Sequence, residues 1–152
     1  MRFEWLGIAE ASAVDARGAV ALIGLNQNIE IASVVPAMVR RTVMVYAVDD
    51  PDEDRPPGST IHVTIGIASP SGETARQEFE LVTQPKNFPE LPGAIQVATE
   101  FVFRAPEHGT YRVSAVIEPS AEERLEREIE FHVVQPVGDG RPQENNESLQ
   151  RS

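Results

Sequence analysis

Residues 60–67 read Thr-Ile-His-Val-Thr-Ile-Gly-Ile, and this stretch decides the fold class. A branched apolar residue stands at every odd position from 61 to 67, with small or polar residues between them. Successive side chains of a β-strand point to opposite faces of the sheet. Strict alternation therefore predicts a strand that is buried on one face and exposed on the other.

The same two-residue period recurs along most of the chain. It is found at 95–103, 110–118 and 128–133 and around Phe79 and Leu81, and further strands are predicted at 5–13, 19–24 and 41–48. Turn sequences separate these runs at 15–18, 70–72 and 106–109, and longer proline-rich connections occupy 51–58 and 84–93. The charged segment 120–125 is interpreted as a loop, because an isolated helix of this length is only marginally stable.

Short strands with regular turn signals are typical of a sandwich or barrel. We therefore predict an all-β protein, a single antiparallel β-sandwich (Ig-like or jelly-roll-like) of about eight strands over residues 1–135. The polar segment 136–152 is predicted to be a disordered tail. The expected aromatic anchors of the core are Trp5, Tyr46, Phe79, Phe101, Phe103, Tyr111 and Phe131.

Composition excludes several classes of protein. The 152 residues carry a formal net charge of −11 and contain no cysteine. A disulfide framework and a thiolate zinc site are therefore excluded, and binding to nucleic acid or to an anionic membrane is disfavoured because a phosphate surface requires basic side chains opposite it. No apolar run reaches the length of a membrane helix and the first residues do not resemble a secretion signal, so we expect a cytoplasmic protein.

The turn and core motifs follow one another in an order seen in a known family. Ala9-Glu10 precedes the turn at 15–18, and an apolar run at 22–26 precedes Ile29-Glu30-Ile31. Later, Phe101-Val102-Phe103 is followed by Pro-x-x-Gly-x-Tyr-Arg at 106–112. Over about residues 5–134 this order resembles a family of small uncharacterised bacterial all-β proteins. The resemblance implies a compact all-β domain, and it implies no functional residues because that family has no assigned activity.

The candidate metal ligands form one acidic segment between two predicted strands. They are Asp49, Asp50, Asp52, Glu53 and Asp54. Five carboxylates in six residues supply the oxygen ligands that Ca²⁺ prefers. The spacing differs from that of an EF-hand loop and Pro51 stiffens the segment, so a solvated loop is the competing interpretation.

No other residues form a recognisable catalytic or cofactor site. The chain has no Gly-x-Ser-x-Gly elbow and no phosphate-binding Gly-x-x-x-x-Gly-Lys sequence. His62 and His132 would approach a zinc ion only if their strands were neighbours, and His108 lies in a turn. Trp5 or Tyr46 on an outer face would suit a sugar, although aromatic residues are more often buried.

These observations favour a non-catalytic module without a cofactor that binds another protein, or a second copy of itself, through a sheet face or an edge strand. Nucleic acid and membranes are not expected partners. Two alternatives remain open: a small ligand-binding or Ca²⁺-binding β-sandwich, an enzyme included, and a structural subunit of a phage-like or injection particle.

Overall fold

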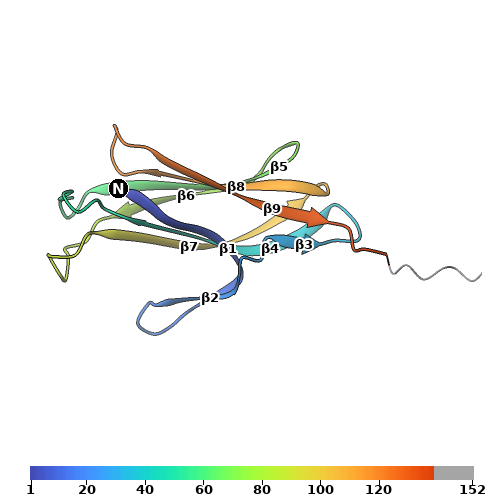
Figure 1. The fold of residues 1–152 in the computed structure, drawn as a ribbon, viewed down its shortest axis with the longest axis horizontal. Helices are drawn as coiled ribbons and strands as arrows, with labels where there is room; N and C mark the ends of the chain where they lie inside the picture. The colour runs from blue at the N-terminus through green and yellow to red at the C-terminus, as the bar shows by residue number, and fades with distance from the viewer. Residues whose placement is uncertain (139–152) are drawn as a thin grey trace, which may run out of the picture.

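The computed structural model describes residues 1–138, which form nine β-strands and contain no helix (Figure 1). The strands are β1 (Arg2–Val14), β2 (Val20–Leu25), β3 (Ile29–Ile31), β4 (Ala37–Val48), β5 (Thr60–Ser69), β6 (Gly72–Val82), β7 (Ala94–Ala105), β8 (Gly109–Glu118) and β9 (Leu125–Val134). The all-β prediction is confirmed, and the described strands number nine rather than about eight. The predicted tail lies for the most part outside the described residues.

The strands form two sheets. One has the order β2-β1-β4-β7 and is antiparallel throughout. The other has the order β3-β9-β8-β5-β6 and is mixed, because β3 runs parallel to β9 with Ile29 opposite His132. The prediction of purely antiparallel pairing was therefore wrong for β3. β3 takes this direction because the chain crosses from one sheet to the other after β2. A strand of only three residues is too short to show in the sequence that such a crossing occurs.

The core lies between the two sheets and is built by the alternating residues. The four apolar side chains of β5 at 61, 63, 65 and 67 are all buried. Phe103, Tyr111 and Phe131 form an aromatic cluster with each pair of ring centroids 6.3 Å apart. This separation lies in the range in which aromatic pairs stabilise a core beyond their buried area.

Three of the seven expected aromatic anchors are only half-buried. Trp5 and Tyr46 are partners in the β1–β4 ladder, next to the buried pair Leu6 and Val45, so they lie on the outer face of the four-stranded sheet. A bulge between Phe3 and Trp5 shifts the register there. Phe79 packs against the edge of the core. The sequence alternation of β1 does not reveal which parity faces inward.

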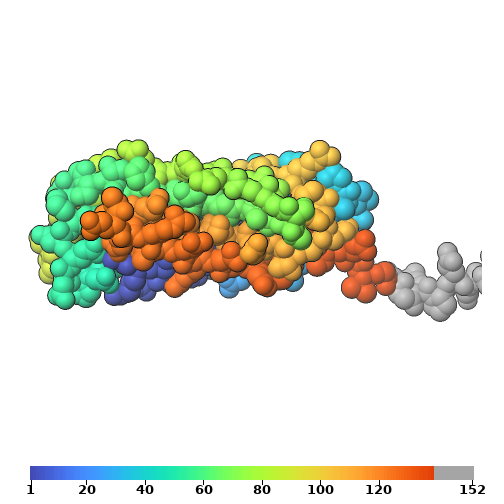
Figure 2. Space-filling model, turned by 90° about the horizontal axis from the view of Figure 1, so that it is seen from above, coloured from blue at the N-terminus to red at the C-terminus, as the bar shows by residue number. Residues whose placement is uncertain are grey.

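The N-terminus and three loops gather at one end of the elongated molecule. Figure 2 shows the segment after β4 and the segment after β8 side by side there, close to the first residues of the chain. The loop between β6 and β7 belongs to the same end (Figure 1). These segments lie far apart in the sequence, so only the fold brings them together.

Candidate functional site

The acidic segment lies in this loop end, between β4 and β5. Asp49 is 4% exposed, Glu53 is half-buried, and Asp50, Asp52 and Asp54 are exposed. The Glu53 amide donates a hydrogen bond to the Asp50 carbonyl over 2.9 Å, so the segment turns back on itself. The five predicted ligands therefore point to different surroundings and do not converge on one point.

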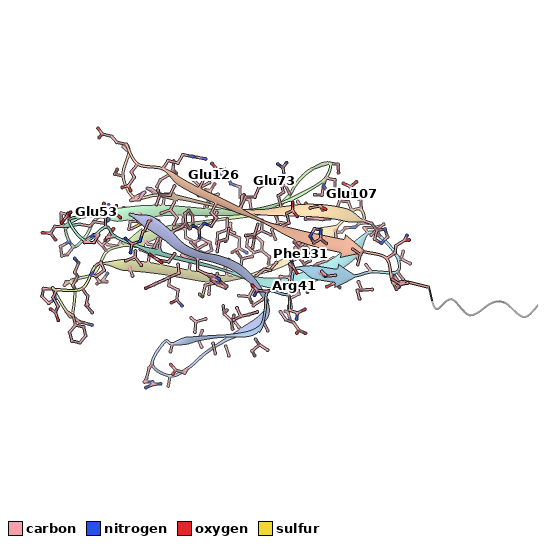
Figure 3. The ribbon with its side chains drawn as sticks, in the orientation of Figure 1. Arg41, Glu53, Glu73, Glu107, Glu126 and Phe131 are labelled. Carbon is pink, nitrogen blue, oxygen red and sulfur yellow. The ribbon has the colours of Figure 1, made fainter. Side chains whose placement is uncertain are left out.

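Two of the carboxylates bind a cation of the protein itself. The Met1 ammonium donates hydrogen bonds to Asp50 Oδ2 at 3.0 Å, to Glu53 Oε2 at 2.8 Å and to Glu123 Oε1 at 3.0 Å. Burial opposes the charged form of this group, but the hydrogen bonds to Glu53, Glu123 and Asp50 outweigh it and raise its pKa to about 11. The hydrogen bond from the ammonium in turn lowers the pKa of Glu53. Figure 3 labels Glu53 at this end of the molecule.

Asp49 is held by Arg55. Arg55 donates from Nε and Nη2 to Asp49 Oδ1 over 3.3 and 3.2 Å and from Nη1 to the Pro119 carbonyl over 3.1 Å, and it also pairs with Glu53. Burial raises the pKa of Asp49, although the hydrogen bonds and charge of Arg55 act in the opposite direction. Arg55 thereby connects the segment after β4 to the end of β8, a role that the sequence did not reveal.

The described residues contain no group of three or more His, Cys, Asp or Glu side chains placed to hold a metal ion. The acidic segment is organised around Arg55 and the Met1 ammonium, while Asp52 and Asp54 face solvent. The calcium hypothesis therefore gains no support from this geometry.

A cavity of about 480 Å³ opens beside Asp49. Its apolar wall comes from the start of β5, the end of β6, the start of β7 and the loop 83–93. The main contributors are Ile61, Leu81, Phe88, Leu91 and Ile95. Asp49, Arg55 and Lys86 supply its charged groups. The volume lies in the range of small-molecule sites, about 300–1,000 Å³.

The loop 83–93 that closes the cavity is fixed at both ends. The Gly58 amide donates to the Thr83 carbonyl over 2.8 Å, and the Asp49 amide donates to the Gly93 carbonyl over 2.8 Å. A Cβ atom at Gly93 would collide with Asp49 Oδ2, so the close approach of these two residues requires glycine. Pro85, Pro89 and Pro92 within the loop keep it from continuing either strand.

The three histidines lie apart from this cavity. His62 is on β5 and His132 is on β9, and β8 lies between these strands in the sheet. Nε2 of His108 lies 2.8 Å from the Ala32 carbonyl oxygen, and Nδ1 of His132 lies 3.2 Å from Thr110 Oγ1. The condition under which His62 and His132 would approach a zinc ion, neighbouring strands, is therefore not met.

A second notable surface is the hairpin formed by the end of β1 and by β2, which we call the β1–β2 arm (residues 10–25). β1 pairs with β4 only from Arg2 to Ala9, and its remaining residues pair only with β2. Figure 1 shows the arm leaving the body of the molecule beneath the four-stranded sheet. Val14, Ile23 and Leu25 on it are large apolar residues that are more than half exposed.

Arg41 anchors the chain where it leaves the arm. Its guanidinium donates to the Gln27 and Ile29 carbonyl oxygens over 3.2 and 3.0 Å and to Glu30 Oε2 over 2.7 Å, and it lies 5.3 Å from the centroid of the Phe131 ring (Figure 3). Arg41 is 8% exposed, so these contacts are shielded from water. The adjacent basic pair in the sequence thus contains one structural arginine, and Arg40 faces solvent.

Comparison with known proteins adds no assignment: no family model matches the chain, and neither does any curated protein. Within residues 1–138, no helix is long and apolar enough to cross a membrane.

Proposed function

We propose that the protein is a non-catalytic assembly module that pairs with a second copy of itself through the free edge of β2. The observation that carries the proposal is the composition of this edge strand. Residues 20–25 read Val-Ala-Leu-Ile-Gly-Leu and contain no charged side chain. An edge strand exposes unpaired backbone N–H and C=O groups, and proteins normally protect such edges with charges, proline or short length.

The other edges of the two sheets carry that protection. β7 presents Glu100 and Arg104, and β6 presents a run of charges at 73, 76, 78 and 80. β3 has only three residues. In addition, Gln77 of β6 donates to the Glu100 carbonyl over 2.9 Å and so occupies part of the β7 edge. Among the described edges, β2 alone is left as an open pairing surface.

The apolar, uncharged edge of β2 is matched better by the same edge of a second copy than by a strand that carries positive or negative side chains. Two β2 strands running antiparallel about a twofold axis can place Leu22 opposite Leu22 of the other copy and Ala21 opposite Ile23. Apolar residues then face apolar residues on both sides, as an isologous interface requires. The net charge of −11 would oppose close approach of two copies elsewhere, and the arm holds β2 away from the body.

The topology also supports an Ig-like sandwich rather than a jelly roll. The order β1-β4-β7 corresponds to strands A, B and E of that fold, and the order β9-β8-β5 corresponds to G, F and C. The Tyr111 hydroxyl donates to the Glu107 carbonyl over 2.7 Å. A tyrosine near the start of strand F that bonds a few residues upstream is a recurring feature of such domains.

Multi-angle light scattering tests the proposal. At tens of micromolar we expect the mass of a dimer, and Ile23→Lys should give the monomer because it places a charge in the pairing strand. Val102→Lys is the matched control: both side chains are 55% exposed and both strands are sheet edges. A monomeric parent, or a dimer that only Val102→Lys dissociates, would contradict the proposal. A larger assembly that Ile23→Lys dissociates would favour the structural-subunit alternative.

A further inference from the structure

The cavity beside Asp49 carries an inference that does not depend on pairing through β2. We propose that it binds a small amphipathic amine, with the ammonium group on Asp49 Oδ2 and the apolar body against the wall formed by β5, β6, β7 and the loop 83–93. The inference concerns a ligand site at the loop end, whereas the proposed pairing uses the β1–β2 arm.

The first step of the argument is the state of the Asp49 carboxylate. Its side chain is 6% exposed, and Oδ1 receives both hydrogen bonds from Arg55. Oδ2 receives no hydrogen bond from any described residue, and it lies against Gly93, which also lines the cavity. No side-chain nitrogen or oxygen of the described residues is both fully buried and without a partner, so Oδ2 keeps some access to solvent. Burial of the rest of the Asp49 side chain still limits the water that can solvate this oxygen. A donor entering the cavity would satisfy it.

The second step concerns the charge of the ligand. The donors of Arg55 are directed to Asp49, to Glu53 and to the Pro119 carbonyl, so this guanidinium is not available to an anion without breaking those bonds. The neighbouring segment adds the exposed carboxylates of Asp52 and Asp54. Lys86 is the remaining cation of the cavity lining, and it makes no ion pair within the described residues. Asp52 and Asp54 do not line the cavity, so they act only at longer range; together with the net charge of −11 they favour a cationic head group over an anionic one.

The third step concerns the body of the ligand. Ile61, Leu81 and Ile95 form the inner wall, and Phe88 and Leu91 of the loop are 61% and 56% exposed at the mouth. Exposed large apolar residues around a cavity supply the area that a hydrocarbon chain can cover. The fixed ends of the loop keep this surface in place without a ligand.

Hexylamine is a suitable probe, compared with 1-hexanol and hexanoate as matched molecules that differ in the head group. Binding is followed by the amide resonances of Gly93 and Lys86 in ¹⁵N-labelled protein. We expect hexylamine to shift both resonances with a Kd on the order of millimolar, as its small size allows, and to bind about tenfold more tightly than hexanol. Hexanoate should bind least.

Two variants distinguish the contact of the ammonium group with Asp49 from nonspecific apolar binding. Asp49→Asn should reduce hexylamine binding to the level of hexanol and leave hexanol unchanged. Because Asp49 also pairs with Arg55 and its loss can unfold the loop, Leu91→Lys provides a second test with an exposed residue at the mouth. It should weaken hexylamine several-fold without changing the melting temperature, whereas Met38→Lys, at a 66% exposed position outside the cavity lining, should have no effect.

The proposal is overturned if hexylamine fails to shift Gly93 and Lys86 at tens of millimolar. It is equally overturned if hexanoate binds more tightly than hexylamine, because Lys86 would then be the group that binds the ligand. It is also overturned if folded Asp49→Asn or Leu91→Lys protein binds hexylamine as tightly as the parent does. These outcomes are independent of the mass measured for the parent and Ile23→Lys, so failure here is distinguishable from failure of the pairing through β2.

Discussion

Replacing Tyr111 by phenylalanine tests how the turn between β7 and β8 is held. Tyr111 is fully buried, and its hydroxyl donates to the Glu107 carbonyl over 2.7 Å and accepts the Glu107 amide over 3.3 Å. Burial raises the pKa of Tyr111, so the phenol remains protonated and able to donate at neutral pH. Phenylalanine keeps the ring contacts with Phe103 and Phe131 and removes only the hydroxyl.

The expected loss follows from these contacts. A net intramolecular hydrogen bond stabilises by about 0.5–1.5 kcal/mol, and a buried backbone group left without a partner costs about 1–3 kcal/mol. Glu107 is only half-buried, so water replaces part of what the hydroxyl supplied. We therefore expect the free energy of unfolding to fall by about 1–2 kcal/mol. With an m-value of about 1–3 kcal/mol/M in urea, the midpoint moves down by roughly 0.5–1 M.

Urea unfolding followed by the fluorescence of Trp5, the only tryptophan, and by circular dichroism measures this shift. Tyr46→Phe is the control, because Tyr46 is the other tyrosine and its hydroxyl makes no hydrogen bond to a described residue. The free energy of unfolding of Tyr46→Phe should stay within about 0.5 kcal/mol of that of the parent. Equal effects of the two substitutions, or a loss below about 0.5 kcal/mol for Tyr111→Phe, would refute the assignment of the hydroxyl to this turn.

Three further predictions follow from other contacts. Arg41→Met should lower the free energy of unfolding by about 2–4 kcal/mol, because it breaks the buried ion pair with Glu30. Arg40→Met, at the neighbouring exposed guanidinium, should change it by less than about 0.5 kcal/mol. Similar decreases in the free energy of unfolding for the two variants in chemical denaturation would contradict this. The raised pKa of the Met1 ammonium means that its ion pairs stabilise the fold fully below pH 8 and are lost as the pH rises towards 11. The N-acetylated chain should therefore melt at a lower temperature at pH 7, with the difference disappearing near pH 11; a difference that persists there would argue against it. Gly7→Ala should displace the Trp5 indole, which lies where the new methyl group must go, and unchanged Trp5 emission would exclude that contact.

Alternation in the sequence was sufficient to predict most of the fold. The strand around 60–67 and those at 95–103, 110–118 and 128–133 all appear in the structure, with the parity of the buried residues as expected. This works because a two-residue period is a local property of the backbone, and each of these strands buries one face in the same core. The turns at 15–18 and 70–72 were likewise readable from their residues.

The candidate site was less accessible to prediction. The acidic segment was recognised as distinctive, yet its partners are Arg55 and the Met1 ammonium, and the hydrogen bond to Glu123 joins residues 122 positions apart in the chain. The cavity beside Asp49 requires the ends of three strands and the loop 83–93 to meet. Neither arrangement leaves a motif, because a carboxylate has the same local pattern whether it faces solvent, a metal or a buried guanidinium.

The sequence by itself determined that this is an acidic, cysteine-free, all-β protein, where most of its strands lie and, in strands such as β5, β8 and β9, which parity is buried. Tertiary structure decided the rest: the strand order, the parallel pairing of β3 with β9, the uncharged edge of β2 and the carboxylate oxygen that faces the cavity. The physical reason is the range of the forces involved. Side-chain alternation and turn preference act over a few residues, whereas an ion pair, a free edge or a cavity exists only after distant segments have packed together.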